Sequence, residues 1–222
     1  MMATYGLAQE KSIHFLKAFD KVKVYKGLEV NLIPSHEQKI VITGEKASEV
    51  YLKNKKGSLT ITLNLKSVFD SKSLQIDLHY TGFLLELEVF QGATIRSIHT
   101  LEQAQLQLSA QEDAHIELDL ALEYLKIKAF TGGSLQLTGT TKAQNCKFLT
   151  GATYQAFNLK SKHTNIVVSS GAVANIYTDA VLDAKATFGG IVNYKGSPSS
   201  LLSKKSMGGQ IKPQQDLQNQ GQ

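Results

Sequence analysis

Carboxylates are the residues of this chain that could do acid–base chemistry or hold calcium, and eight of them lie between residues 91 and 212. They are Glu102, Glu112, Asp113, Glu117, Asp119, Glu123, Asp179 and Asp183. Hydrolysis of a glycan needs two carboxyl groups about 5–9.5 Å apart, and calcium needs a cluster of oxygen ligands. Glu117 and Asp119 alternate with apolar residues, a pattern typical of a strand with one solvated face. We therefore expect surface acids and no catalytic residues.

Histidine and cysteine offer little more chemistry. The six histidines are His14, His36, His79, His99, His115 and His163. No two of them have metal-ligand spacing along one strand, so we predict no metal site. The single cysteine, Cys146, excludes an intrachain disulfide and a multi-cysteine zinc site. Aligned on the repeat described below, it falls with Leu125 and Ile166, which predicts a buried and inert core thiol.

The charge of the chain is mildly basic, with a net charge of +5 and a pI of about 9.1. A basic excess favours polyanions. The lysines, however, fall singly or in pairs at polar positions and lack the interleaved aromatic residues that a nucleic-acid platform needs. We expect most of them to be solvated surface and expect no nucleic-acid partner. No apolar run approaches the ~20 residues of a membrane-spanning helix, so no transmembrane segment is predicted.

Short alternating segments dominate residues 15–90, and such segments are typical of half-buried strands. Leu59-Thr60-Ile61-Thr62-Leu63 is an example, and turn residues such as Lys26-Gly27 and Lys56-Gly57 separate the segments. No segment has a sustained helical period. This region is predicted to be a run of hairpin-like or meandering strands that caps one end of the molecule.

A repeat of about 20 residues governs the second half of the chain. Its marker is a small or polar corner residue that recurs at intervals of 21, 19, 19, 20, 19 and 19. The corners are Gly92, Asp113, Gly132, Gly151, Gly171, Gly190 and Gly209. Glycine suits a sharp corner because it accepts positive φ and close approach of a neighbouring chain. No helix pattern follows these glycines, so they are not phosphate-binding loops.

Each repeat is too short to bury its apolar face alone, so the repeats must stack. The predicted interior positions recur in each repeat, and they include Leu106, Leu108, Ile116, Leu118, Leu125, Ile127, Leu135, Leu137, Cys146, Phe148, Tyr154, Phe157, Ile166, Val168, Val173, Ile176, Ala184, Ala186, Ile191 and Val192. Stacking at the ~4.8 Å strand spacing gives a parallel β-solenoid with one continuous core.

The domain boundaries follow from these patterns. Residues 1–14 are interpreted as the remnant of a secretory leader or an ordinary disordered start. Residues 15–212 are predicted to form a single β-solenoid domain, with 15–90 as the N-terminal strand region and 91–212 as the coils. Residues 213–222 carry too little apolar surface to pack and are expected to be a disordered tail.

Several segments resemble one known family. They are Phe19-Asp20-Lys21-Val22-Lys23-Val24 followed by Leu28-Glu29-Val30, Gly57-Ser58-Leu59-Thr60-Ile61, Thr150-Gly151-Ala152, Ser170-Gly171-Ala172 and Tyr194-Lys195-Gly196-Ser197-Pro198. Over about residues 15–213 the chain resembles the head-GIN-domain proteins of Bacteroidetes-type bacteria, a family named for auto-transporter adhesins. The resemblance implies a right-handed β-helix, export, a periplasmic, outer-membrane-associated or extracellular location, and no catalytic residue or cofactor. Two features depart from the family pattern: Glu112-Asp113 replaces a glycine corner, and an apolar signal core is lacking.

Two functional hypotheses follow from the repeat and the scattered acids. The first is a non-enzymatic envelope or surface protein, adhesive or structural, whose partner is a surface glycan or an envelope or matrix protein. The alternative is a carbohydrate-binding or carbohydrate-cleaving β-helix, which a groove with two or more carboxylates and nearby aromatic residues would favour. Polyanion binding through lysines is a third hypothesis, and self-association into a homo-oligomer is left open.

Overall fold

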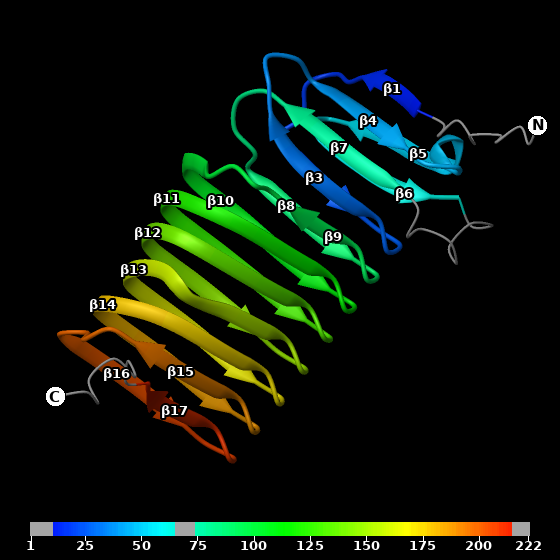
Figure 1. The fold of residues 1–222 in the computed structure, drawn as a ribbon. Coiled ribbons are helices and arrows are strands. Elements are labelled where there is room, and N and C mark those ends of the chain that lie inside the picture. Colours follow the sequence, from blue (N-terminus) through cyan, green and yellow to red (C-terminus); the bar gives the residue numbers. More distant parts are fainter. Residues whose placement is uncertain (1–10, 65–73, 215–222) are drawn as a thin grey trace, which may run out of the picture.

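The computed structural model describes residues 11–64 and 74–214, and their strands join into one sheet wound as a β-solenoid (Figure 1). The N-terminal strands are β1 Lys11–Phe15, β2 Lys21–Val24, β3 Glu29–Pro34, β4 Lys39–Thr43, β5 Val50–Lys55, β6 Ser58–Leu63, β7 Gln75–Tyr80, β8 Glu86–Phe90 and β9 Thr94–Arg96. The coil strands are β10 Leu101–Gln111, β11 His115–Phe130, β12 Ser134–Phe148, β13 Thr153–Ser169, β14 Val173–Thr187, β15 Ile191–Lys195, β16 Ser200–Lys205 and β17 Gln210–Pro213. The predicted all-β solenoid is confirmed, and its right-handed winding stays a prediction.

Each coil has two faces. Face A contains β6, β2, β8, the second halves of β10 to β14, and β16. Face B contains β7, β3, β9, the first halves of β11 to β14, β15 and β17. The chain crosses between the faces at a tight corner on one edge and at a wider bend on the other. All these coil strands pair in parallel, as stacked coils of one hand must.

The corners are two-residue turns in which both residues have positive φ. In Gln91-Gly92 the φ angles are 56° and 67°, and the turn closes with a hydrogen bond from the Ala93 N–H to the Phe90 carbonyl at 3.2 Å. These angles are those of a type I′ turn, which favours glycine at its second position. Successive corners are also bonded to each other, for example from the Gly151 N–H to the Ser170 carbonyl at 3.1 Å.

Two predicted corner glycines are wrong by one residue. The positive-φ pairs of the last two corners are Phe188-Gly189 and Met207-Gly208, so Gly190 and Gly209 lie one position later. That later position points into the core and holds a buried alanine in other coils. Two adjacent glycines occur at each of these corners. The sequence does not indicate which glycine is in the turn and which points into the core, because both positions favour a residue without a large side chain.

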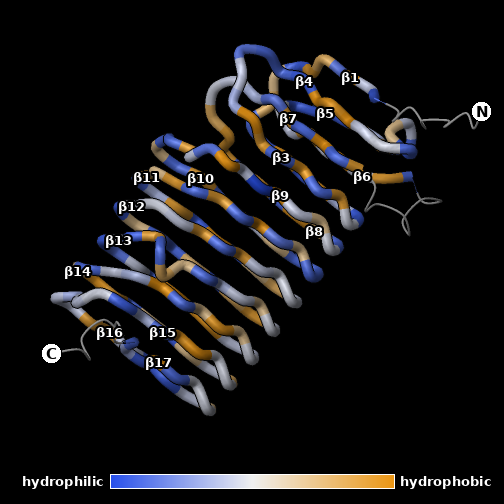
Figure 2. The backbone as a smooth tube through the Cα atoms, viewed as in Figure 1, coloured by the Kyte–Doolittle hydropathy of each residue, from blue (hydrophilic) through white to orange (hydrophobic). Residues whose placement is uncertain are grey.

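The core runs along the solenoid axis, and apolar and polar residues alternate along the coils (Figure 2). Most of the predicted interior positions are buried. Phe157, Val173 and Ile191 are wrong, since they are only partly buried. In β13 an irregularity between Ala156 and Lys160 shifts the register and changes which side chains face inward.

The N-terminal region is partly cap and partly solenoid, which corrects the expected meander. The hairpin at Lys56-Gly57 is confirmed, because β5 and β6 pair antiparallel, and β4 pairs antiparallel with β1 and β7. In contrast, β2 lies between β6 and β8, and β3 lies between β7 and β9, all in parallel. The chain therefore inserts its second and third strands between two coils that come later in the sequence.

The predicted boundaries also change. Residues 11–14 belong to β1 and are not a disordered start, because β1 pairs with β4. At the other end, Pro213 belongs to β17 and Gln214 donates a backbone hydrogen bond to the Tyr194 carbonyl at 2.8 Å. The remaining parts of the predicted leader and tail, 1–10 and 215–222, lie outside the described residues.

Candidate binding surface along the solenoid edge

The acids that could have formed a catalytic pair are held in separate structural contacts. Asp119 accepts hydrogen bonds from the Thr100 hydroxyl at 2.5 Å and the Thr138 hydroxyl at 2.7 Å, one coil away on each side. These two bonds, more than the opposing effect of burial, hold the pKa of Asp119 below its ordinary value. Glu117 contacts Arg96 at 3.4 Å. Both acids therefore join neighbouring coils on face B.

No group of three histidine, cysteine or acidic side chains lies close enough to hold a metal ion in the parts of the chain that the structure describes. Within the same parts, no helix is long and apolar enough to cross a membrane. The prediction that Cys146 is a buried core residue is confirmed, but one of its two predicted neighbours is wrong. Cys146 is buried, but its rung partners are Ile127 and Ile166, not Leu125. Burial raises the pKa of its thiol, which disfavours the reactive thiolate.

A buried polar network surrounds this cysteine, and sequence patterning did not reveal it. The Gln144 side-chain oxygen accepts a hydrogen bond from the Tyr154 hydroxyl at 2.8 Å and contacts the Cys146 sulfur at 3.4 Å. The Gln144 amide donates to the Thr164 hydroxyl at 3.1 Å, which contacts Ser161 at 3.3 Å. Every member has a partner, so the network stabilises the core and leaves no polar group aimed at a ligand.

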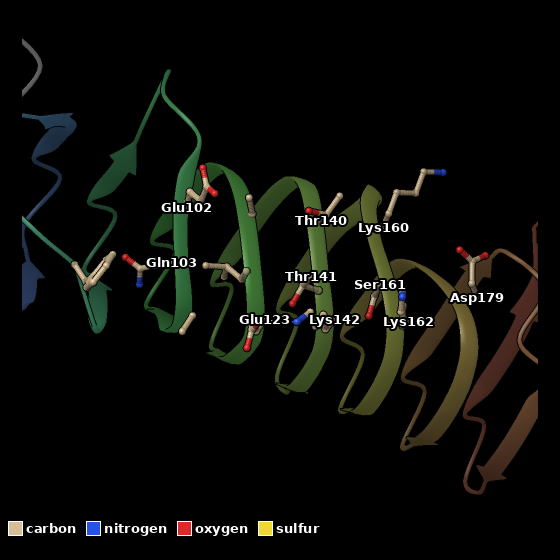
Figure 3. Close-up of a pocket in the computed structure, with 14 residues that line it drawn as sticks. Glu102, Gln103, Glu123, Thr140, Thr141, Lys142, Lys160, Ser161, Lys162 and Asp179 are labelled. Atoms are coloured by element: carbon tan, nitrogen blue, oxygen red, sulfur yellow. Dashed lines mark hydrogen bonds and ion pairs between the residues drawn. The ribbon is translucent and has the colours of Figure 1, made fainter.

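A trough runs along the bend edge of the solenoid and is the main candidate site (Figure 3). Three successive residues of each coil build it, in the order wall, floor and ridge. The wall column is Glu102, Ala121, Thr140 and Lys160; the floor column is Gln103, Leu122, Thr141 and Ser161; the ridge column is Ala104, Glu123, Lys142, Lys162 and Asp179. Tyr177 and Thr178 continue the wall and floor columns in register, just beyond the lining of the trough. The trough has a volume of about 820 Å³.

The floor is fixed by hydroxyl groups that bond to the chain just after the bend. Thr141 donates to the Ala143 carbonyl and Ser161 to the His163 carbonyl, each at 3.1 Å. Both side chains are buried, whereas the wall and ridge side chains point outward. An inward floor between two outward columns leaves a hollow that follows the solenoid axis over five coils, or about 20 Å at the ~4.8 Å strand spacing.

Both signs of charge line the trough. On the ridge, the Lys142 ammonium contacts the Glu123 carboxylate at 2.5 Å. On the wall, the Lys160 ammonium lies 3.5 Å from the centre of the Tyr177 ring. Such cation–π contacts stabilise both partners in place. Phe83, which is 64% exposed, lies at the opposite end of the trough. The trough therefore has Phe83 at one end and the Lys160–Tyr177 pair at the other, of which Lys160 lines it, and both polar and apolar side chains lie between them.

A second hollow lies on the other side of the ridge, on face A. It has two parts of about 340 and 290 Å³, and Tyr124 lines both of them. Val181 and His163 line the part nearer the C-terminal end. The bend edge thus presents two neighbouring hollows. Neither hollow is predicted by the sequence pattern, although Leu122, Thr141 and Ser161 recur at intervals of about 19 residues.

The family model described as "Putative auto-transporter adhesin, head GIN domain" matches residues 18–198. The chain belongs to this head GIN domain family. The resemblance stated from the corner and terminal segments is therefore confirmed, whereas no curated protein matches the chain.

Three solved structures of similar fold come from species of Bacteroides and Parabacteroides. One described as a putative adhesin from Bacteroides fragilis has a TM-score of 0.81 at 18% identity, covering 94% of this chain and 98% of its own. Another putative adhesin, from Parabacteroides merdae, has a TM-score of 0.71 at 16% identity, with 93% and 96% covered. A protein from Parabacteroides distasonis described as a putative lipid binding protein has a TM-score of 0.71 at 14% identity, with 93% and 97% covered. At these identities the likeness shows a shared fold alone.

Proposed function

We propose that this head GIN domain is a non-enzymatic adhesin of the cell surface, and that its bend-edge trough binds an extended glycan. The observation that carries the proposal is the trough itself, with hydrogen-bonding groups on successive coils, Phe83 in its lining at one end, and Tyr177 held against Lys160 beside the other end. The adhesin names of the family and of its structural neighbours support a location outside the cytoplasm, in the periplasm, at the outer membrane or beyond it.

The chemistry of the trough favours a glycan over a peptide. Sugar hydroxyls both donate and accept hydrogen bonds, which suits a lining that mixes carboxylates, ammonium groups, amides and hydroxyls. Aromatic rings suit the apolar faces of sugar rings. A peptide bound by strand addition would need a free strand edge. The strands under the trough are already paired with a coil on each side, from β11 to β13.

Cleavage of a glycan is the second candidate, since the trough contains Glu102, Glu123 and Asp179. Their placement favours binding over cleavage. Glu102 and Asp179 lie four coils apart, about 19 Å along the axis, and this exceeds the carboxyl separation of glycosidases. Glu123 is on the coil next to Glu102, but its carboxylate is engaged by Lys142.

The test is a binding screen on the full chain against immobilised glycans and matrix proteins, with exposed aromatic residues truncated. Phe83→Ala and Tyr177→Ala should each weaken glycan binding about tenfold, as expected for aromatic contacts at the ends of a site. Tyr51→Ala is the matched control, because Tyr51 is 53% exposed on β5 of the cap, away from the trough.

Equal effects of all three substitutions, or binding to matrix proteins alone, would refute the glycan trough. Release of new reducing ends from a bound glycan would instead favour the cleaving enzyme. Loss of glycan binding only in the two trough variants would support the proposal.

A further inference from the structure

The charges of this protein are segregated along the solenoid axis. Residues 84–123 contain eight acids and one arginine, whereas residues 126–212 contain eleven lysines and two acids. The net charge of the whole chain is only +5, because the acidic band and the strongly basic band that follows it partly cancel. A local field of this kind attracts ligands of opposite charge more than the net charge suggests.

Four of these lysines form a single file on face A. Strand register places Lys128 beside Lys147 and Lys185 beside Lys204, with Val167 between the two pairs. We call Lys128, Lys147, Lys185 and Lys204 the lysine column. All four are exposed, and among the described residues none of them makes an ion pair. Neighbouring rungs are only ~4.8 Å apart.

Such a file of like charges is unfavourable for the fold itself. Like charges directly opposite one another on adjacent strands destabilise a sheet. Nearer the N-terminus, the same file has an acid next to a lysine, so the charges are paired. Lys23 lies beside Glu88, and their charged atoms are 2.5 Å apart. Lys21 and Glu86 form a similar pair at 3.4 Å on the adjacent file. The C-terminal coils lack these acids, so the lysine column has charge that a ligand could neutralise.

The file of residues beside the column has two amides at its centre, in the order Lys126, Asn145, Asn165, Asp183 and Leu202. Asn145 and Asn165 lie two positions before Lys147 and Val167 on the same strands and face outward beside the lysines. Asn165 donates to Asp183 at 3.3 Å, an acid of the same file. Lysines can bind carboxylates and amides can bind hydroxyls, so the strip suits a polymer that offers both on every unit.

We propose that the lysine column binds an acidic polysaccharide that lies along the solenoid axis. A chain of uronic acids carries one carboxylate per sugar, and a sugar unit in an extended chain is about as long as one strand spacing. A duplex or single-stranded nucleic acid would need a broader basic surface with stacking rings. An anionic membrane would need a two-dimensional patch with several apolar residues to insert, whereas Leu202, which is 52% exposed, is a single apolar side chain at one end of the flanking file. The lysine column is one file wide, which favours a linear polymer.

This site is separate from the trough, and its test does not depend on the trough. The probe is polygalacturonate, compared with fully methyl-esterified polygalacturonate, which has the same backbone without the charge. The full chain should bind the acid form at least about tenfold tighter at low salt, and the preference should fall as salt rises because counterions are released on binding. The variant K128Q, K147Q, K185Q, K204Q should lose that preference.

A matched control removes the same charge elsewhere. The variant K17Q, K53Q, K55Q, K56Q takes four exposed lysines from the N-terminal part and should keep the preference. A Phe83→Ala variant should keep it too, so loss of the trough and loss of the lysine column are distinguishable. The melting temperature of the column variant at low salt should be equal to or above that of the parent, which shows that lost binding is not lost folding.

Three results would overturn the proposal. They are equal binding of the acid and ester forms, an equal loss of preference in both lysine variants, and absence of polygalacturonate binding with retention of DNA or of vesicles containing phosphatidylglycerol.

Discussion

At the scale of single residues, the polar side chains of this protein mostly join one coil to the next. Asp119 bonds to threonines on both neighbouring coils, and Arg96 contacts Glu29 at 2.8 Å and Glu117 at 3.4 Å. Asn193 and Asn175 continue this pattern along face B with a bond of 2.8 Å. Cross-strand pairs of this kind each contribute about 0.2–1 kcal/mol. Many residues that could carry out chemistry are therefore occupied in structure.

Replacing Asp119 by alanine should lower the free energy of unfolding by about 1 kcal/mol at pH 7, because two charge-assisted hydrogen bonds are lost at a partly exposed site. The pKa of this carboxyl is lowered in the folded state, so its contribution is complete above the ordinary value of 3.8 and is lost as the pH falls through the folded value. Urea denaturation at pH 7 and at pH 3 measures this difference.

The decrease in the free energy of unfolding caused by Asp119→Ala should be smaller at pH 3 than at pH 7. A deficit of equal size at both pH values would show that the ionised carboxylate is not what stabilises these coils.

At the scale of elements, the corner and the bend place different demands on the backbone. Several corners have open space around the turn, and non-glycine residues such as Asp113 adopt positive φ at the corners at the cost of local backbone strain. Near the bend the coils approach each other closely. A Cβ added to Gly139, whose φ is +99°, would lie 2.1 Å from the Leu120 carbonyl oxygen of the previous coil. That oxygen is backbone and belongs to the ladder, so it cannot move without disturbing the stack.

Gly139→Ala should therefore cost about 2–5 kcal/mol, from backbone strain and overpacking together. The matched control is Gly151→Ala at a corner, where φ is +71° and no atom lies within 4 Å of the added Cβ. Its expected cost is about 1 kcal/mol, from the left-handed conformation alone. Chemical denaturation of both variants tests the difference, and equal costs would contradict the close approach at the bend.

At the scale of the whole molecule, the two ends of the solenoid are built differently. The N-terminal end is closed by β1, β4 and β5, and its first coil strands are interleaved with later ones. The C-terminal end finishes with β16, whose side chains are all exposed, and β17, most of whose side chains are exposed. In a stacked repeat, stability depends mainly on contacts between neighbours. An end strand with little buried surface should be dispensable, whereas a strand held between two coils should not.

A chain ending at residue 196, which lacks β16 and β17, should keep a cooperative melt at a lowered temperature. A chain beginning at residue 36, which lacks β1 as well as the interleaved strands β2 and β3, should not melt cooperatively. Val22, Val24, Val30 and Leu32 are nearly completely buried, and their removal separates β6 and β7 from β8 and β9. Thermal melts followed by circular dichroism compare the two chains, and a cooperative melt of the second would contradict the interleaved order.

The sequence alone predicted the coils, the corners and most of the core, since each is encoded within one repeat. Alternation along Leu135 and Leu137 fixes which side chains face inward, and positive φ at the corners selects glycine. The trough and the lysine column were missed because they depend on register between coils. Repeat intervals vary by a residue or two, and the irregularity in β13 shifts the register again, so the alignment of Lys147 with Lys185 cannot be read from spacing.

The sequence by itself determined the local pattern: strands of a half-buried sheet, turned by glycine at regular corners and stacked on one apolar interior. Only the tertiary structure decided the order in which the coils stack, since β2 and β3 lie between segments that follow them by more than twenty residues. The physical reason is that a parallel coil with an apolar inner face can stack on any other such coil. Which partner it takes depends on the contacts of the whole assembled core.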